Sequence, residues 1–126
     1  MVNIVPTEDM EQCVFVDWLR LNHIAHFRVP NETYTKSFKQ KAKNKALGVV
    51  PGVPDLFIAL PSVGLLAIEM KRTKLSVTSQ AQKDWQVLLN QCPGTQAFIC
   101  KGADEAIKIV ESFIVIPART STDSLF

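Results

Sequence analysis

Residues 52–71 read GVPDLFIALPSVGLLAIEMK, two apolar runs separated by a short turn. We expect strands at about 55–60 and 65–71. Because nearly every position of both runs is apolar, both should be central strands that are covered on both faces. The charged residues in these runs are Asp55, Glu69 and Lys71. Charged groups are costly to bury unless they are paired or bind a metal, so these three mark a candidate site.

The rest of the chain alternates helical and extended patterns around these two strands. We expect further strands at about 25–29 and 96–100, and helices at about 7–22, 35–47, 79–91 and 103–113. This order is typical of an α/β domain with a mixed central sheet flanked by helices. Residues 117–126 are polar and rich in Ser and Thr, so we expect one domain over residues 1–116 and a flexible C-terminal tail.

Composition excludes several classes of protein. The chain has 126 residues, of which 47% are hydrophobic, and a net charge of +2, so it can bury a core and is not disordered. No apolar run reaches the roughly 18 residues that span a membrane, and the first residues lack a signal-peptide pattern. The three cysteines have no metal-binding spacing and should be reduced. We expect a cytoplasmic protein with no membrane partner and no small-molecule cofactor.

The turn between the two central strands decides whether the charged residues can meet. Side chains two residues apart in a strand share a face, so Glu69 and Lys71 should point one way and Met70 the other. A four-residue loop at 61–64 would place Asp55 opposite Met70, facing away from Glu69. A loop of odd length, or a β-bulge, would place Asp55 on the Glu69 face. A joint site therefore requires one of these two irregularities.

Two carboxylates on one face can hold a hard divalent cation such as Mg²⁺, which prefers oxygen ligands. Lys71 could then orient an attacking water or stabilise charge on a phosphate oxygen. In the alternative, Glu69 and Lys71 form only an ion pair and Asp55 only caps a turn. The histidines, His23 and His26, both follow the expected end of a helix near residue 22, so their spacing does not place them on one helix face, and they are not expected to bind a metal.

Five lysines fall within ten residues that contain no acidic residue: Lys36, Lys39, Lys41, Lys43 and Lys45. A lysine run of this kind is either a solvated helix face or a patch that contacts the phosphates of a nucleic acid.

Pro54-Asp55 followed by Glu69-Met70-Lys71 matches the PD-(D/E)xK nuclease signature, a motif that is weak when it stands alone. More of the chain matches in order, namely residues 30–32 (PNE), 48–56 (GVVPGVPDL), 68–72 (IEMKR), 79–85 and 102–106. Over about residues 7–116 the chain resembles the VRR-NUC family, and most of all its short stand-alone members from phages and bacteria.

The resemblance implies a restriction-endonuclease-like core and a metal-dependent nuclease. It implies catalytic roles for four residues, Asp55, Glu69, Lys71 and Gln82, although Gln80 is an alternative to the last.

The resemblance also implies a further acid on the N-terminal helix. Glu11 is our first choice, and Glu8, three residues earlier and nearly one turn away, is the alternative. Glu11 would bind Mg²⁺ or Mn²⁺ together with Asp55 and Glu69. Asn31 and the lysine segment would contact the DNA backbone, which positions a substrate without reading its sequence.

The implied function is that of a Mg²⁺- or Mn²⁺-dependent endodeoxyribonuclease in a bacterial cell, encoded by the bacterium or by a phage. Stand-alone members are similar to Holliday-junction resolvases and can act as homodimers, so we expect branched DNA as the substrate and a twofold dimer. The alternatives are a nuclease of the same core with nicking, flap or restriction-like specificity, a non-catalytic DNA-binding module, and a purely structural domain.

Overall fold

The structure is a computed structural model that describes residues 4–30 and 37–114. Within these residues the elements follow the order α1 (Glu8–Leu21), β1 (His26–Arg28), α2 (Phe38–Ala46), β2 (Leu56–Leu60), β3 (Gly64–Lys71), α3 (Gln80–Asn90), β4 (Thr95–Lys101) and α4 (Ala103–Phe113). The prediction of an α/β domain is confirmed. Asn31, Lys36 and the tail at 117–126 lie outside the described residues.

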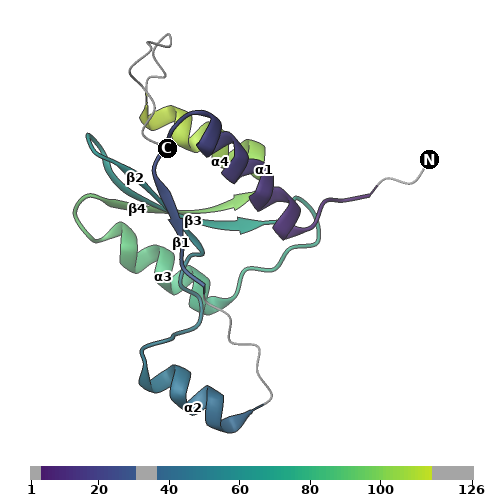
Figure 1. The fold of residues 1–126 in the computed structure, drawn as a ribbon, viewed down its shortest axis with the longest axis vertical. Helices are drawn as coiled ribbons and strands as arrows, with labels where there is room; N and C mark the ends of the chain where they lie inside the picture. Colours follow the sequence, from purple (N-terminus) through teal and green to yellow (C-terminus); the bar gives the residue numbers. More distant parts are fainter. Residues whose placement is uncertain (1–3, 31–36, 115–126) are drawn as a thin grey trace.

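The strands of the described chain form one mixed sheet in the order β1-β2-β3-β4 (Figure 1). β2 pairs antiparallel with both β1 and β3, whereas β3 pairs parallel with β4. β2 and β3 are therefore the central strands, as their continuous apolar runs predict.

The turn between β2 and β3 has the odd length that a joint site requires. Leu60 pairs with Gly64, so three residues form the loop. Continued past the start of β2, this register sets Asp55 opposite Glu69, on the same face of the sheet. Position 64, where β3 begins, requires glycine. Its φ is +132°, which side chains disfavour, and an added Cβ would collide with the carbonyl of Gly94. Glycine is thus required at the residue that closes the three-residue loop.

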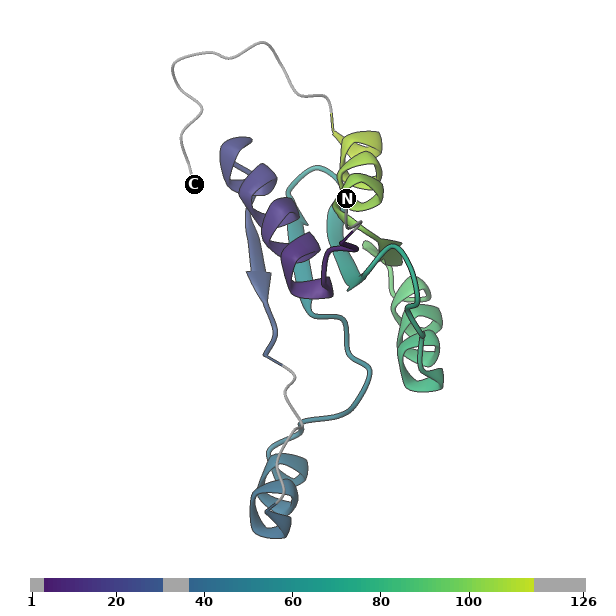
Figure 2. The same cartoon turned by 90° about the vertical axis from the view of Figure 1, so that its right-hand side faces the viewer.

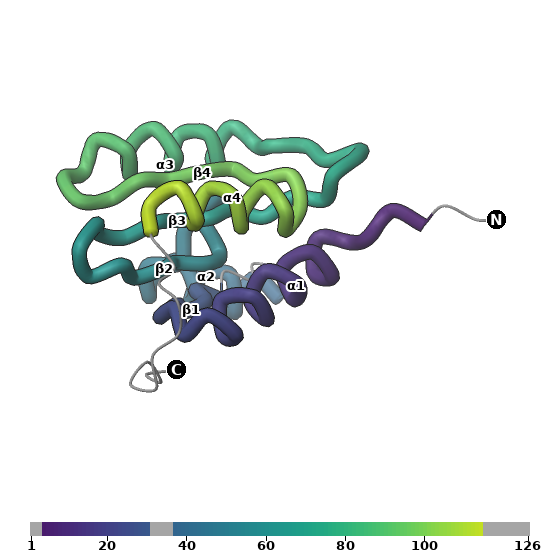
Figure 3. Tube along the Cα trace, turned by 90° about the horizontal axis from the view of Figure 1, so that it is seen from above, coloured from purple at the N-terminus to yellow at the C-terminus, as the bar shows by residue number. Residues whose placement is uncertain are grey.

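One face of the sheet is covered by α1 and α4, which pack against each other (Figures 1 and 3). The main core lies beneath them and includes fully buried side chains of both helices and of the central strands: Phe15, Leu19, Ile58, Ile68, Met70 and Val110. Met70 therefore points away from the face of Glu69, as the alternation of the strand predicts.

The opposite face carries a smaller apolar cluster built on Phe57, Ala67 and Ala97, against which Leu89 of α3 packs. α3 lies beside β4, at the side of the sheet away from α1 (Figure 3). Glu69 follows Ala67 by two residues along β3, so it faces the α3 side.

The segment before Asp55 is fastened to α3. The indole N–H of Trp85 donates a hydrogen bond to the carbonyl of Pro51 at 3.1 Å. Gly52 packs so closely on α3 that an added Cβ would lie 2.7 Å from the Cβ of Ala81. These contacts fix the path of the chain into β2 and so fix where Asp55 begins that strand.

α2 projects away from the sheet and its covering helices (Figures 1 and 2). It has no buried residue, and its N-terminus is capped by Ser37, whose hydroxyl accepts a hydrogen bond from the Gln40 N–H at 3.2 Å. Lysines 39, 41, 43 and 45 on this helix are all exposed. Among the described helices, none has both the length and the apolar character to cross a membrane.

Candidate active site

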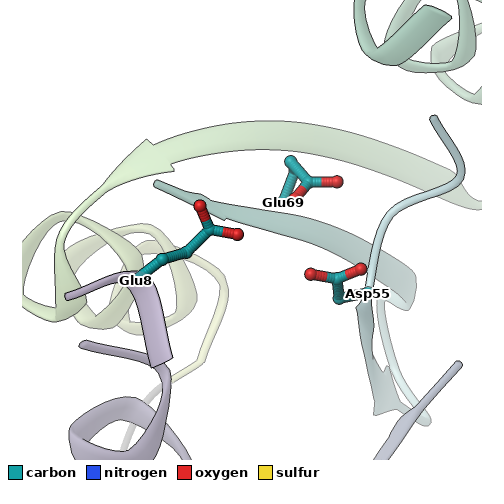
Figure 4. Close-up of side chains that lie close together, drawn as sticks. All are labelled: Glu8, Asp55 and Glu69. Atoms are coloured by element: carbon teal, nitrogen blue, oxygen red, sulfur yellow. The ribbon is translucent and has the colours of Figure 1, made fainter. Parts of the chain in front are cut away.

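Three carboxyl groups lie close together in the structure, and two of them belong to the site predicted from the sequence. Glu8, Asp55 and Glu69 each offer an oxygen atom, and these atoms lie within 4.8 Å of one another (Figure 4). They come from the first turn of α1, the residue before β2 and the interior of β3. The antiparallel register brings Asp55 and Glu69 together, and α1 brings in Glu8 from the other end of the sequence.

The structure places Glu8, and not Glu11, beside Asp55 and Glu69, so the first choice for the helix acid does not match the geometry. Thr7 caps α1 through its hydroxyl, which accepts a hydrogen bond from the Met10 N–H at 3.1 Å. Glu8 is thereby the first residue of the helix. Glu11 is directed elsewhere, because its carboxylate accepts a hydrogen bond from the backbone of α4.

Lys71 lies on the same face of β3 as Glu69, and both are deeply buried, with exposed fractions of 7% and 4%. Lys71 also interacts electrostatically with all three carboxyl groups, since its charge lowers the pKa of each. A cation held among three acids in this way reduces their mutual repulsion.

The structure distinguishes the two glutamines. Gln82 forms a capping box with Ser79: its side-chain oxygen accepts from the Ser79 N–H at 3.0 Å, and its own N–H donates to the Ser79 hydroxyl at 3.2 Å. A further side-chain hydrogen bond joins Gln82 to Glu69 and lowers the pKa of that carboxyl. Because this hydrogen bond lowers the pKa of Glu69, it stabilises the charged carboxylate, which can only accept, so the amide NH₂ group of Gln82 is the donor. Gln80 instead donates to Asp84 and lies outside the cluster.

Burial makes the acids hard to ionise. The pKa of Glu69 is raised to about 8, first by burial and then by the charges of Asp55 and Glu8. The pKa of Asp55 is also raised by burial, although Arg28 and Lys71 oppose the rise and a hydrogen bond with Glu69 stabilises its charge. Burial likewise raises the pKa of Glu8. Without a cation the cluster therefore retains a proton near neutral pH.

The donor set fits a hard divalent cation. It consists of carboxylate oxygens, which Mg²⁺ and Mn²⁺ favour, and the acids are close enough for one ion to contact them together. A divalent charge would replace the retained proton and relieve the repulsion between the acids.

Comparison with known proteins identifies the family of the chain. The family model described as VRR-NUC domain matches residues 2–104. The chain belongs to the VRR-NUC family. A solved structure titled "VRR_NUC domain protein" is 26% identical, covers 98% of this chain and 100% of its own, and superposes with a TM-score of 0.66. No curated protein matches the chain.

Membership of the VRR-NUC family implies a nuclease of the PD-(D/E)xK type with DNA as its substrate. The family is generally metal dependent, and the acidic cluster of this member is a possible metal site.

Arg28 is a feature of this VRR-NUC domain that the sequence did not reveal. It lies on β1, paired with Leu56, the residue after Asp55, and its charge lowers the pKa of Asp55. The only signal in the sequence was an arginine at the end of a short strand. Its nearness to Asp55 depends on the pairing of β1 with β2, which the pattern of either strand alone does not specify.

Proposed function

We propose that this protein is a Mg²⁺- or Mn²⁺-dependent endodeoxyribonuclease, in which Glu8, Asp55 and Glu69 hold the metal. The observation that carries the proposal is the meeting of three acids from distant parts of the chain within 4.8 Å, beside a buried lysine. A purely structural domain would gain little from this arrangement, since three clustered acids, of which Glu69 is buried, carry more negative charge than Lys71 and Arg28 together offset.

The bound ion would supply Lewis-acid activation of water and of the phosphate. Lys71 positions the attacking water and stabilises negative charge on the phosphodiester oxygens, because its ammonium group is held on the face where the acids meet. Gln82 orients Glu69 through its amide NH₂ group, while its oxygen keeps the start of α3 in place. The Gln82 side chain thus both caps the N-terminus of α3 and holds Glu69 in place.

The exposed lysines of α2, together with Lys36 and Asn31, are proposed to contact the DNA backbone. α2 contributes no buried residue to the domain, and its exposed lysines are accompanied by no acid within the helix. Such a helix would hold a polyanion through phosphate contacts and would not select a base sequence.

The proposed substrate is branched DNA, and the proposed assembly is a homodimer. The chain is almost entirely taken up by the catalytic core, so no separate element for reading a base sequence accompanies it among the described residues. A four-way junction has twofold symmetry, which a dimer with two active sites would match.

The test is cleavage of labelled four-way junctions beside matched flap and linear duplexes, in Mg²⁺, Mn²⁺ or EDTA. We expect paired, symmetric cuts on the junction, with no cutting in EDTA or by Asp55→Asn. Metal-dependent cutting of another substrate would retain the nuclease and overturn the junction specificity. Tight binding of DNA without cutting in either metal would overturn the catalytic proposal.

A further inference from the structure

Glu11 connects α1 to the beginning of α4. The backbone N–H of Ala103 donates a hydrogen bond to Oε1 of Glu11 at 3.0 Å, across 92 positions of sequence. Gly102, the N-cap residue of α4, has no side chain with which to cap the helix. Glu11 therefore caps α4 from another helix, and its negative charge suits the positive end of the α4 dipole.

The packing around Gly102 leaves room for this contact. A Cβ added to Gly102 would lie 3.5 Å from both carboxylate oxygens of Glu11 and 2.8 Å from Cγ2 of Thr73. The φ of Gly102 is +93°, which also favours glycine. A Cβ at this position would crowd Thr73 and would only touch the Glu11 carboxylate, so Gly102 and Glu11 already pack in van der Waals contact as one unit.

This unit is attached to the strand that carries the active site. The N–H of Gly102 donates to the carbonyl of Lys71 at 2.9 Å. Lys71 is the last residue of β3 and lies two positions from Glu69, on the same face. The start of α4 is thus held to the end of β3 on one side and to Glu11 on the other.

Glu11 also lies close to Glu8 along α1. Three residues of an α-helix advance the chain by roughly 4.5 Å and nearly complete a turn. Fixing Glu11 against Ala103 therefore fixes the height and rotation of the first turn of α1, from which Glu8 reaches Asp55 and Glu69.

We infer that Glu11 is a positioning residue: by capping α4 it sets Glu8 at the distance from Glu69 that metal binding requires. The inference rests on the proposed function of the acidic cluster. It assigns different roles to Glu8 and Glu11, two of the three acids in the first turn of α1: Glu8 would contact the metal, and Glu11 holds the helix that presents Glu8.

The experiment is a calorimetric titration of the full chain with Mn²⁺ at pH 8 and low temperature, without DNA. Glu11→Ala should weaken Mn²⁺ binding by about 10- to 100-fold, the range typical of residues that orient metal ligands. Glu11→Gln should weaken it less, because its amide oxygen can still accept from Ala103. Asp104→Ala is the matched control: it removes an exposed carboxylate from the first turn of α4 without breaking the tie to α1, and should bind Mn²⁺ like the wild type.

A double-mutant cycle with Glu8→Ala separates positioning from direct coordination. If Glu11 acts through Glu8, adding Glu11→Ala to Glu8→Ala causes no further loss of Mn²⁺ affinity. Additive losses would overturn the inference, because they would make Glu11 an independent ligand. Wild-type affinity in a folded but less thermostable Glu11→Ala would overturn it too, leaving only a structural cap.

Glu11→Asp keeps the charge but shortens the side chain by one methylene, so it should weaken Mn²⁺ binding as Glu11→Ala does. If Glu11→Ala does not fold, Glu11→Asp is used in its place. Failure of the wild type to bind Mn²⁺ would instead overturn the proposed metal site, and the inference with it.

Discussion

The metal-free protein should lose stability as the pH rises, because Glu69 is buried with a raised pKa. The pKa is about 8 in the folded protein, against an ordinary value of 4.5. Below about pH 4.5 the carboxyl is protonated in the folded and unfolded states, so its contribution to stability is fully present. Between these two pH values the unfolded chain releases the proton while the folded protein retains it, and stability falls. Above about pH 8 the loss is complete.

The size of this loss follows from the difference between the two pKa values. At about 1.4 kcal/mol for each pKa unit, the raised pKa of Glu69 corresponds to a loss of about 5 kcal/mol across the whole range. That is comparable to the entire free energy of unfolding of a small domain, so the metal-free protein should be fragile at alkaline pH.

The assay is urea unfolding in EDTA, followed by circular dichroism at several pH values between 5 and 8.5. The wild type should show a falling free energy of unfolding across this range. Glu69→Gln, which cannot ionise, should show a much flatter dependence and should be the more stable protein at pH 8.5. Glu111→Gln, a change at an exposed position of α4, should follow the wild type.

Added Mg²⁺ provides a second check on the same cluster. A ligand present at 100 times its dissociation constant stabilises the folded state by about 2.7 kcal/mol. This gain should appear in the wild type at pH 8 and be largely absent in Glu69→Gln. Parallel pH curves for the wild type and Glu69→Gln would refute the reasoning, since they would mean that the Glu69 carboxyl titrates normally.

Three further predictions concern Gln82, the turn before Asp55 and the lysines of α2. Gln82→Glu should keep the helix cap, because a carboxylate oxygen can also accept from Ser79, but should replace the donor to Glu69 by a like charge, so kcat should fall at least about tenfold. Gly52→Ala should destabilise the protein by about 1–3 kcal/mol in urea unfolding, because its Cβ would overlap α3. Lys41→Ala and Lys45→Ala should each weaken DNA binding and lower the slope of log affinity against log salt by about 1, measured by fluorescence anisotropy.

Each of these predictions has an outcome that would contradict it. Unchanged kcat in Gln82→Glu would mean that the amide acts only as a cap. A Gly52→Ala protein as stable as the wild type would show that the turn before Asp55 can move away from α3 without cost. If the salt slope stays the same after both lysine changes, α2 does not contact the DNA backbone.

The core of the site could be predicted from the sequence because charged residues inside apolar runs are rare and expensive. Asp55, Glu69 and Lys71 stand out for this reason, and strand alternation alone separates Glu69 and Lys71 from Met70. Whether the β2–β3 loop has an odd or an even number of residues could not be predicted from the sequence; it could only be named as the condition for a joint site. It depends on whether Gly64 pairs with Leu60, which its packing against Gly94 decides.

The choice between Glu8 and Glu11 shows where local patterns stop being informative. Both acids occupy the first turn of α1, and both suit the positive end of that helix. The position of α4 distinguishes them: the N-terminus of α4 donates a hydrogen bond to Glu11, whereas Glu8 lies beside Asp55 and Glu69. That contact joins residues at opposite ends of the chain, so no local spacing indicates it.

The most direct test of the metal site is a crystal of the protein soaked in Mn²⁺ at pH 8, with anomalous differences measured for the metal. We predict a strong peak among the carboxylates of Glu8, Asp55 and Glu69, and its loss in Asp55→Asn. A wild-type crystal with no peak at this cluster, or with its strongest peak elsewhere on the protein, would contradict the assignment of these three acids as the metal site.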